Sequence, residues 1–200
     1  MEIITPMILI SLLPYSPRRI FALVATLVCL ASVSCFASES LLLSVASTPY
    51  DRQMSRIQPV LFTKAKAETK LSLGVVNHWI QDLRSIPYGF SPEWKTPEEV
   101  ATAPVADCKG KAVALYEKMR QQGVQNVRLV IGKRTWTSRK THAWLEWGTE
   151  GGTYVLDPTI NWSACRADRV GKRDYIPLYA YAGARKYRAT PTTSTLLARN

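Results

Sequence analysis

The chain has 200 residues, which is enough for one domain with a hydrophobic core. Hydrophobic residues make up 46% of it and no repeat of fixed period is visible, so the sequence excludes a disordered chain and a solenoid. The formal net charge of +11 favours acidic partners, although a merely soluble basic surface has the same charge. No nucleic-acid-binding module is visible, and we predict no nucleic-acid partner.

Residues 1–37 have the pattern of a secretory signal. Arg18 and Arg19 precede an apolar run over 20–33, and small residues follow over 32–38. The apolar run is near the lower length limit for crossing a bilayer, so an uncleaved membrane anchor is the alternative. We therefore expect a periplasmic or otherwise exported protein that meets the membrane only through this segment.

The leader changes how the four cysteines are interpreted. Cys29 and Cys35 fall within it, which leaves Cys108 and Cys165. Cys35 resembles a lipoprotein cysteine, but Ser32 stands where such a signal has a large aliphatic residue. In an exported protein the remaining two could form one disulfide. No close Cys/His spacing indicates zinc, and we predict no metal site.

The first part of the mature chain has two expected segments. Residues 38–62 contain Ser, Thr, Pro and scattered charges, which predicts a linker or a loosely packed lead-in. A helix is predicted over 63–84, where an apolar stripe has helical spacing: Val76, Trp79, Ile80 and Leu83. A proline-rich loop follows, with one short turn at 98–100.

The next helix is predicted to begin after Asp107, which is a good N-cap residue. Gly123 is a natural stop. Its apolar stripe extends back to Cys108 and contains Ala112, Leu115, Tyr116 and Met119. Cys108 is therefore expected in the first helical turn, where unpaired amides and the helix dipole stabilise a thiolate.

Strands are predicted over 126–131, 142–147, 153–156 and 175–181. The basic segment 132–141, with Lys133, Arg134, Arg139 and Lys140, is predicted to be a loop. It either adds positive charge near the thiolate, steers an acidic substrate or is simply solvated. The basic, Thr-rich tail over 184–200 is predicted to be disordered. Helices followed by antiparallel strands indicate an α+β domain over 63–183.

Hairpin geometry predicts that His142 and Asp157 meet. If Gly148 faces Thr153 across the turn, Trp144 faces Asp157. His142 is two residues from Trp144, so it points to the same side of the sheet as Asp157. A register slip of one residue would place the two on opposite faces.

These placements predict a catalytic triad. Asp157 would hold one imidazole nitrogen of His142, and the other nitrogen would face the Cys108 thiol. The other histidine, His78, lies beside the apolar stripe of its helix and is expected to be structural.

The same segments resemble the transglutaminase-like fold, which is related to papain-like cysteine peptidases. The matching text is Asp107-Cys108 opening a helix, His-Ala-Trp-Leu-Glu over 142–146 and Tyr-Val-Leu-Asp-Pro-Thr over 154–159. The segment 94–100 resembles the bacterial transglutaminase-like cysteine peptidase branch, and the resemblance covers about 73–181. It implies a papain/transglutaminase-like α+β domain, with N-terminal helices and a catalytic cysteine whose helix packs on an antiparallel sheet.

The resemblance implies an exported cysteine peptidase or amidase without a cofactor, acting through a thioester on a protein or peptide, for example a cell-surface protein. Cys108 would be the nucleophile, His142 the base and Asp157 its orienter. The Cys108 backbone amide is the expected oxyanion donor, with Trp94 and Asn77 as candidates for a second donor. An amine acyltransferase of the same fold and a non-catalytic binding module are the alternatives.

One motif departs from that peptidase branch. The branch has Asp-Cys-Glu-Asp, whose acidic side chains serve calcium, whereas this chain has Asp107-Cys108-Lys109-Gly110. A hard cation needs several oxygen ligands, so we do not predict calcium. Lys109 is expected to add positive charge near the thiolate.

Overall fold

The computed structural model describes residues 42–65, 70–171 and 173–190. The predicted leader, with its anchor and lipoprotein alternatives, lies outside the described residues. Within the described ranges, no helix is long and apolar enough to cross a membrane.

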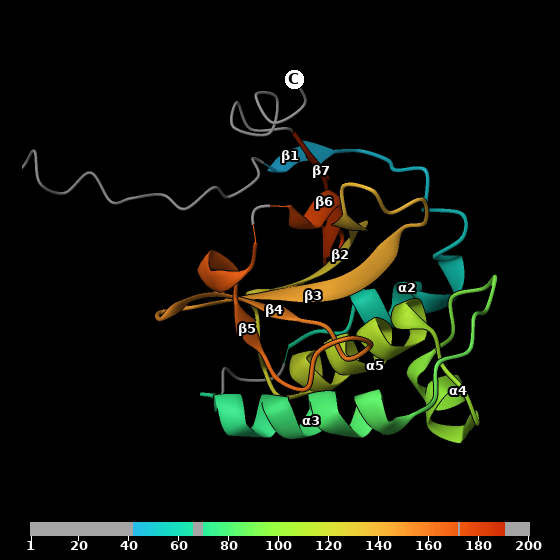
Figure 1. Ribbon diagram of the computed structural model, residues 1–200. Helices are drawn as coiled ribbons and strands as arrows, with labels where there is room; N and C mark the ends of the chain where they lie inside the picture. Colours follow the sequence, from blue (N-terminus) through green and yellow to red (C-terminus); the bar gives the residue numbers. More distant parts are fainter. Residues whose placement is uncertain (1–41, 66–69, 172, 191–200) are drawn as a thin grey trace, which may run out of the picture. The chain divides into compact units, whose positions relative to one another are not determined.

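A seven-stranded antiparallel sheet forms the centre of the domain, with strand order β1-β7-β6-β2-β3-β4-β5 (Figure 1). The strands are β1 (Leu42–Val45), β2 (Val127–Thr135), β3 (His142–Thr149), β4 (Gly152–Leu156), β5 (Cys165–Arg166), β6 (Asp174–Ala182) and β7 (Arg185–Ala189). In the part of the chain that the structure describes, the α-helices are α2 (Gln58–Leu61), α3 (Leu73–Ser85), α4 (Pro97–Thr102) and α5 (Cys108–Gln121), and the short 3-10 helices are η1 (Ser55–Ile57) and η2 (Ala167–Arg169).

Helix α5 packs against β2 and β3 and carries the main core. The predicted stripe of α5 is confirmed, because Ala112, Leu115, Tyr116 and Met119 are all fully buried. Alternate residues of β3 face α5, and Trp144 lies in a second apolar cluster with Val130, Val155, Tyr175 and Ala180. Both faces of the central strands are therefore covered.

The N-terminal helix starts later than predicted. Helix α3 begins after Ser72, whose side chain accepts a hydrogen bond from the Val75 amide (3.4 Å). The apolar spacing begins only in this region, so the expected start at residue 63 was too early. The short turn predicted at 98–100 is the centre of α4, which Thr96 and Glu99 close with a capping box.

Two segments are more ordered than their composition suggests. Residues 42–62, predicted as a loose lead-in, contain β1, η1 and α2, and bury four apolar side chains in the main core: Met54, Ile57, Val60 and Leu61. The prediction of a loose lead-in was wrong because its prolines and serines indicate a loop, whereas the buried side chains from Met54 to Leu61 have a short helical spacing. The tail prediction is also wrong for 185–189, which form β7 between β6 and β1; residues 191–200 lie outside the described ranges.

The basic segment 132–141 is only partly a loop. Strand β2 continues to Thr135, and a register shift against β6 falls between Ile131 and Gly132. A Cβ at Gly132 would lie 2.1 Å from the Ile176 carbonyl oxygen, so the close approach of β6 requires glycine here. Gly132 is paired with His142, which places this irregularity beside the candidate site.

Candidate functional site

The local sequence places Cys108 at the first position of α5. The Asp107 carboxylate caps the helix by accepting a hydrogen bond from the Gly110 amide (3.0 Å), as predicted. Cys108 is 8% exposed, and both it and Cys165 are free thiols, so the alternative disulfide does not form. The first amides of a helix have no carbonyl partner within it, so the start of α5 favours a negative charge.

The β3–β4 hairpin brings His142 to Asp157. Gly148 pairs with Thr153 and Leu145 pairs with Leu156, which is the predicted register. His142 opens β3, and Asp157 directly follows β4. The His142 Nε2 and Asp157 Oδ2 atoms are 2.7 Å apart.

The Cys108 side chain lies close enough to His142 to act on the pKa of its imidazole. Because Asp157 occupies Nε2, Nδ1 is the nitrogen left for the sulfur. Burial opposes protonation of the imidazole, but the hydrogen bond with Asp157 and the negative charges of Asp157 and Cys108 outweigh it and raise the pKa of His142 to about 9. The structure thus brings the three predicted residues together, and the imidazole is in an environment that favours imidazolium.

Asp157 is fully buried and has four hydrogen-bond donors. Oδ2 accepts from His142 and from the Tyr175 hydroxyl (2.9 Å), while Oδ1 accepts from the amides of Thr159 (2.9 Å) and Ile160 (3.3 Å). Burial raises the pKa of Asp157, but these donors and the charge on His142 outweigh it and hold the pKa below its ordinary value. Asp157 is therefore set up as a carboxylate that keeps a proton on His142 Nε2.

Tyr175 is a site residue that the sequence did not reveal. Its backbone has φ +52°, and its hydroxyl also accepts a hydrogen bond from Asn161 Nδ2 (3.0 Å). The Arg134 guanidinium lies 4.3 Å from its ring centroid, and Trp144 packs edge-on against it (5.3 Å). Burial and the Asp157 charge raise the pKa of Tyr175, so it stays a hydroxyl that donates to Asp157. The sequence predicted that Tyr175 lies in a strand, but it did not predict the contact with Asp157.

Two lysines, Lys109 and Lys111, lie near the start of α5. The Lys109 ammonium contacts the Asp107 carboxylate and donates to the Ser91 carbonyl (2.8 Å), so its charge is directed to the helix cap. Lys111 is buried, and it donates to the Ile86 carbonyl at the C-cap of α3 (2.5 Å). Burial lowers the pKa of Lys111. This lysine was missed because its neighbours in the sequence are small and apolar.

The other predicted residues have structural contacts. Asn77 Oδ1 accepts a hydrogen bond from the Ala164 amide (2.8 Å), which holds the loop after Asp157 against α3. Trp94 is buried in the main core. Their oxyanion role stays a prediction. His78 is exposed on α3, where its Nε2 atom lies 3.6 Å from Asp82 Oδ2. This contact is separate from the hydrogen bonds of the triad.

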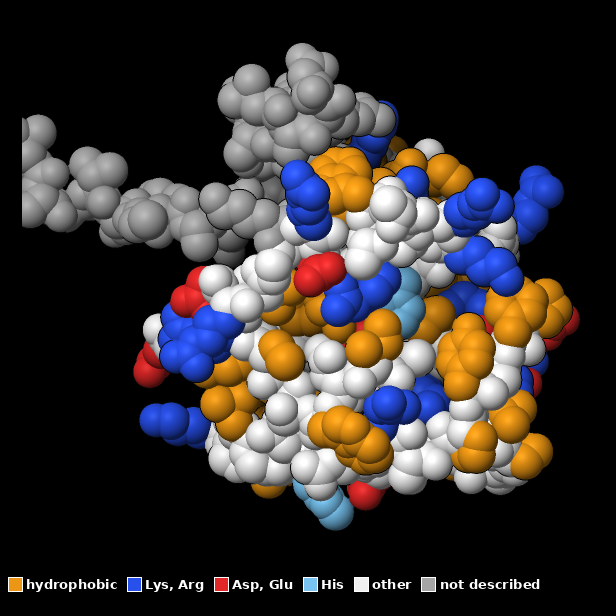
Figure 2. All heavy atoms as spheres, viewed as in Figure 1, with side chains coloured by type: hydrophobic (Ala, Val, Ile, Leu, Met, Phe, Trp, Pro, Cys, Tyr) orange, Lys and Arg blue, Asp and Glu red, His pale blue; other side chains and the backbone are white. Residues whose placement is uncertain are grey.

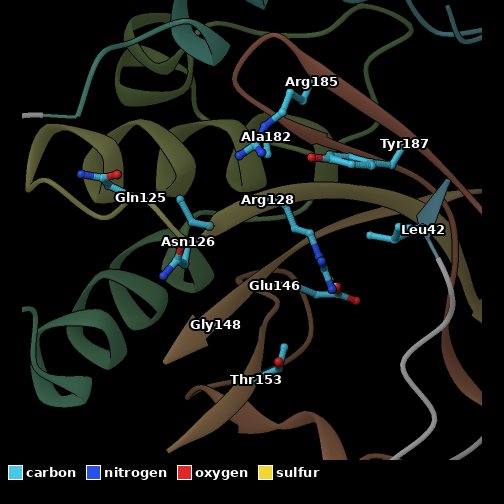
Figure 3. Close-up of a pocket in the computed structure, with 11 residues that line it drawn as sticks. Leu42, Gln125, Asn126, Arg128, Glu146, Gly148, Thr153, Ala182, Arg185 and Tyr187 are labelled. Carbon is cyan, nitrogen blue, oxygen red and sulfur yellow. Dashed lines mark hydrogen bonds and ion pairs between the residues drawn. The ribbon is translucent and has the colours of Figure 1, made fainter. Parts of the chain in front are cut away.

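The described surface also has a cavity of about 320 Å³ that none of the triad residues lines. Figure 3 shows Arg128 and Glu146 on its wall, where Arg128 Nε and Glu146 Oε2 are 2.7 Å apart. Among the described residues, no group of three or more His, Cys, Asp or Glu side chains could hold a metal ion. The candidate site is thus distinct from this cavity.

Comparison with known proteins gives a match in fold. No protein-family model matches the chain, and no curated protein matches it. The EGTA-treated structure of Legionella pneumophila LapG is similar with a TM-score of 0.50 and 15% identity, over 72% of this chain and 80% of that chain. Calcium-bound LapG has a TM-score of 0.49 and 14% identity, over 76% of this chain and 92% of that chain.

LapG is a bacterial cysteine peptidase of the transglutaminase-like fold. At this low identity, the similarity to the EGTA-treated structure shows a relation in fold alone. The predicted α+β, papain/transglutaminase-like class is confirmed.

Proposed function

We propose that this protein is an exported cysteine peptidase or amidase that forms a thioester on Cys108. One observation carries the proposal: His142 is hydrogen-bonded to Asp157 and lies within electrostatic reach of Cys108, which opens helix α5. Acyl transfer requires a nucleophile, a base and a group that orients the base. The leader pattern at 1–37 supports export, and a protein or peptide is the proposed substrate.

Acylation begins from a thiolate–imidazolium pair. The Cys108 sulfur attacks an amide carbonyl carbon and forms a C–S bond, and the carbonyl oxygen becomes an oxyanion. The Cys108 amide, at the open start of α5, is the proposed oxyanion donor. Imidazolium His142 then gives its proton to the amide nitrogen, the C–N bond breaks, and an amine leaves.

Deacylation uses the same groups in the opposite direction. Neutral His142 takes a proton from water as the oxygen attacks the thioester carbon. The C–S bond breaks, the acid product leaves, and the Cys108 thiolate and imidazolium are regenerated. Asp157 keeps the proton on Nε2 throughout, so Nδ1 is the nitrogen that exchanges protons. No cofactor is needed for either step.

The chain offers an internal control for the activated nucleophile, because Cys165 is a second free thiol that is less buried. We would treat the protein with iodoacetamide at pH 6 and measure labelling of each cysteine by mass spectrometry. An ordinary thiol has a pKa of about 8.5 and is mostly protonated there, so Cys108 should react faster than Cys165 despite its burial. In the His142→Ala protein this advantage should disappear. Equal, slow labelling of Cys108 in both proteins would overturn the proposal.

Hydrolysis is tested with a peptide mixture and an added primary amine. Wild-type protein should generate new carboxyl and amino termini, and the Cys108→Ala protein should generate neither. Products that carry the added amine in place of a new carboxylate would instead show acyl transfer. An absence of both products, with Cys108 still activated, would contradict the peptidase assignment.

A further inference from the structure

Two groups of exposed apolar side chains border the candidate site. The Cys-side wall consists of Tyr88 and Phe90, which are 59% and 67% exposed, on the segment that lies beside the start of α5. The Asp-side wall consists of Ile160 and Trp162, which are 40% and 60% exposed, on the loop after Asp157. Figure 2 shows a histidine set between hydrophobic and basic side chains near the middle of the view. Large apolar side chains that remain exposed around a reactive centre indicate a docking surface.

The Cys-side wall is fixed to the nucleophile's helix. Tyr88 forms a parallel bridge with Ala106, and the Gly89 amide donates to the Ala106 carbonyl (3.3 Å). A Cβ at Gly89 would lie 2.4 Å from Val105 Cγ2, so this close approach requires glycine. Burial and the charge on Cys108 raise the pKa of Tyr88, as expected for a phenol near the sulfur. This wall is therefore held next to Cys108.

The Asp-side wall is fixed to the orienting carboxylate. The Ile160 amide donates to Asp157 Oδ1 (3.3 Å), and the Asn161 amide donates to the Asp157 carbonyl (2.9 Å). Further along the loop, the Ala164 amide is bound to Asn77 on α3 (2.8 Å). Trp162 is thus held between two anchored points while its ring remains exposed. The two walls are attached to opposite ends of the triad.

Each wall carries cations on its aromatic face. Lys109 and Lys140 lie 5.0 and 5.5 Å from the Phe90 ring centroid, and Arg84 lies 5.0 Å from that of Trp162. Among the described residues, no ion pair with a carboxylate includes Lys140 or Arg84, and the buried Nε of Arg84 has no hydrogen-bond partner. These two charges are available to an incoming acidic group.

We propose that the walls bind an extended peptide segment with apolar side chains next to the scissile amide and acidic side chains on either flank. The inference rests on the proposed function and names its substrate class. Apolar side chains of the peptide would cover Phe90 and Trp162, while its carboxylates would meet Lys140 and Arg84. The complementary charge agrees with the formal net charge of +11.

The test separates binding from chemistry by using the Cys108→Ala protein and fluorescence anisotropy. Three labelled peptides of equal length would be compared: an apolar centre with Glu flanks, the same centre with Lys flanks, and a Ser/Gly centre with Glu flanks. The first should bind at least about tenfold more tightly than either of the others, because each of the others lacks one of the two complementary features. Equal binding of all three would overturn the inference.

Matched substitutions locate the binding surface. In the same background, Phe90→Ala and Trp162→Ala should each weaken binding of the first peptide about tenfold, whereas Phe62→Ala, at a 51% exposed phenylalanine after α2, should leave it unchanged. Lys140→Glu should reverse the preference for Glu over Lys flanks, whereas Lys118→Glu on the last turn of α5 should not. Unchanged affinity in both wall variants would contradict the inference. Tight binding without cleavage by wild-type protein would uphold it and overturn the proposed function instead.

Discussion

Asp107 and Asp157 are both almost fully buried carboxylates, but they are surrounded by different groups. Asp107 accepts hydrogen bonds from the backbone amides of Gly110 and Ser91, and it pairs with Lys109. Asp157 also accepts two backbone amides, but its other oxygen is bound by the side chains of His142 and Tyr175.

The difference separates two tasks at one site. Asp107 fixes a helix, and through the helix it sets the position of Cys108. Asp157 fixes a side chain, and through His142 it sets the proton-transfer chemistry. We therefore expect changes at Asp107 to act on stability and position, and changes at Asp157 to act on stability and on the state of the imidazole.

The largest expected effect comes from Asp157→Ala. It would leave His142, Tyr175 and two amides without their acceptor in a fully buried place, so the free energy of unfolding should fall by about 3–5 kcal/mol. Urea denaturation followed by tryptophan fluorescence measures this. Asp168→Ala, at an exposed carboxylate paired with Arg166, is the matched control and should leave the midpoint unchanged. An equal shift of the urea midpoint in both variants would contradict a special stabilising role for Asp157.

The next effect is on the pH dependence of stability. The pKa of His142 is raised from 6.5 to about 9, so its protonated form is stabilised by folding. This contribution is fully present below about pH 6.5 and is lost as the pH rises through about 9. Between those values, wild-type protein should lose stability relative to the His142→Gln variant. Parallel stability curves for the two proteins would show that His142 does not titrate as the geometry indicates.

Asp107→Ala tests the other carboxylate. Loss of the cap should lower the free energy of unfolding by about 1–2 kcal/mol, and Asp107→Ser should restore part of it, because serine can accept the Gly110 amide. The pH dependence assigned to His142 should remain in both variants, since neither removes a partner of the imidazole. If that dependence disappeared in Asp107→Ser, the division of tasks between the two aspartates would be wrong.

The two carboxylates also differ in how far the sequence predicts them. Asp107 acts on a residue three positions away, so N-cap preference and apolar spacing predicted both the cap and the place of Cys108. The contact of His142 with Asp157 spans 15 residues, but a tight hairpin turn fixes the register and made it predictable.

Tyr175 reaches Asp157 across 18 residues that include an irregular loop and η2, and no local rule gives that path. The same limit applies to β1 and β7, which bury little: β7 depends on pairing with β6, and β1 depends on pairing with β7. It also applies to Lys111, whose burial is set by the C-terminal end of α3.

Tyr175→Phe is expected to have the smallest effect on stability. It changes the surroundings of Asp157 and leaves those of Asp107 unchanged. It removes one hydrogen bond to Asp157 and should lower the free energy of unfolding by about 1 kcal/mol. With one donor fewer, the carboxylate charge acts more strongly on His142 and should raise the pKa of the imidazole further.

Tyr116→Phe is the matched control, because the Tyr116 hydroxyl is also buried but binds backbone groups of Leu61 and Gly183. Both variants should lose similar stability. Only Tyr175→Phe should change the pKa of His142. An NMR titration that follows the chemical shifts of the imidazole protons measures this pKa. If Tyr116→Phe moved that titration equally, Tyr175 would be a packing residue rather than one that positions the triad through Asp157.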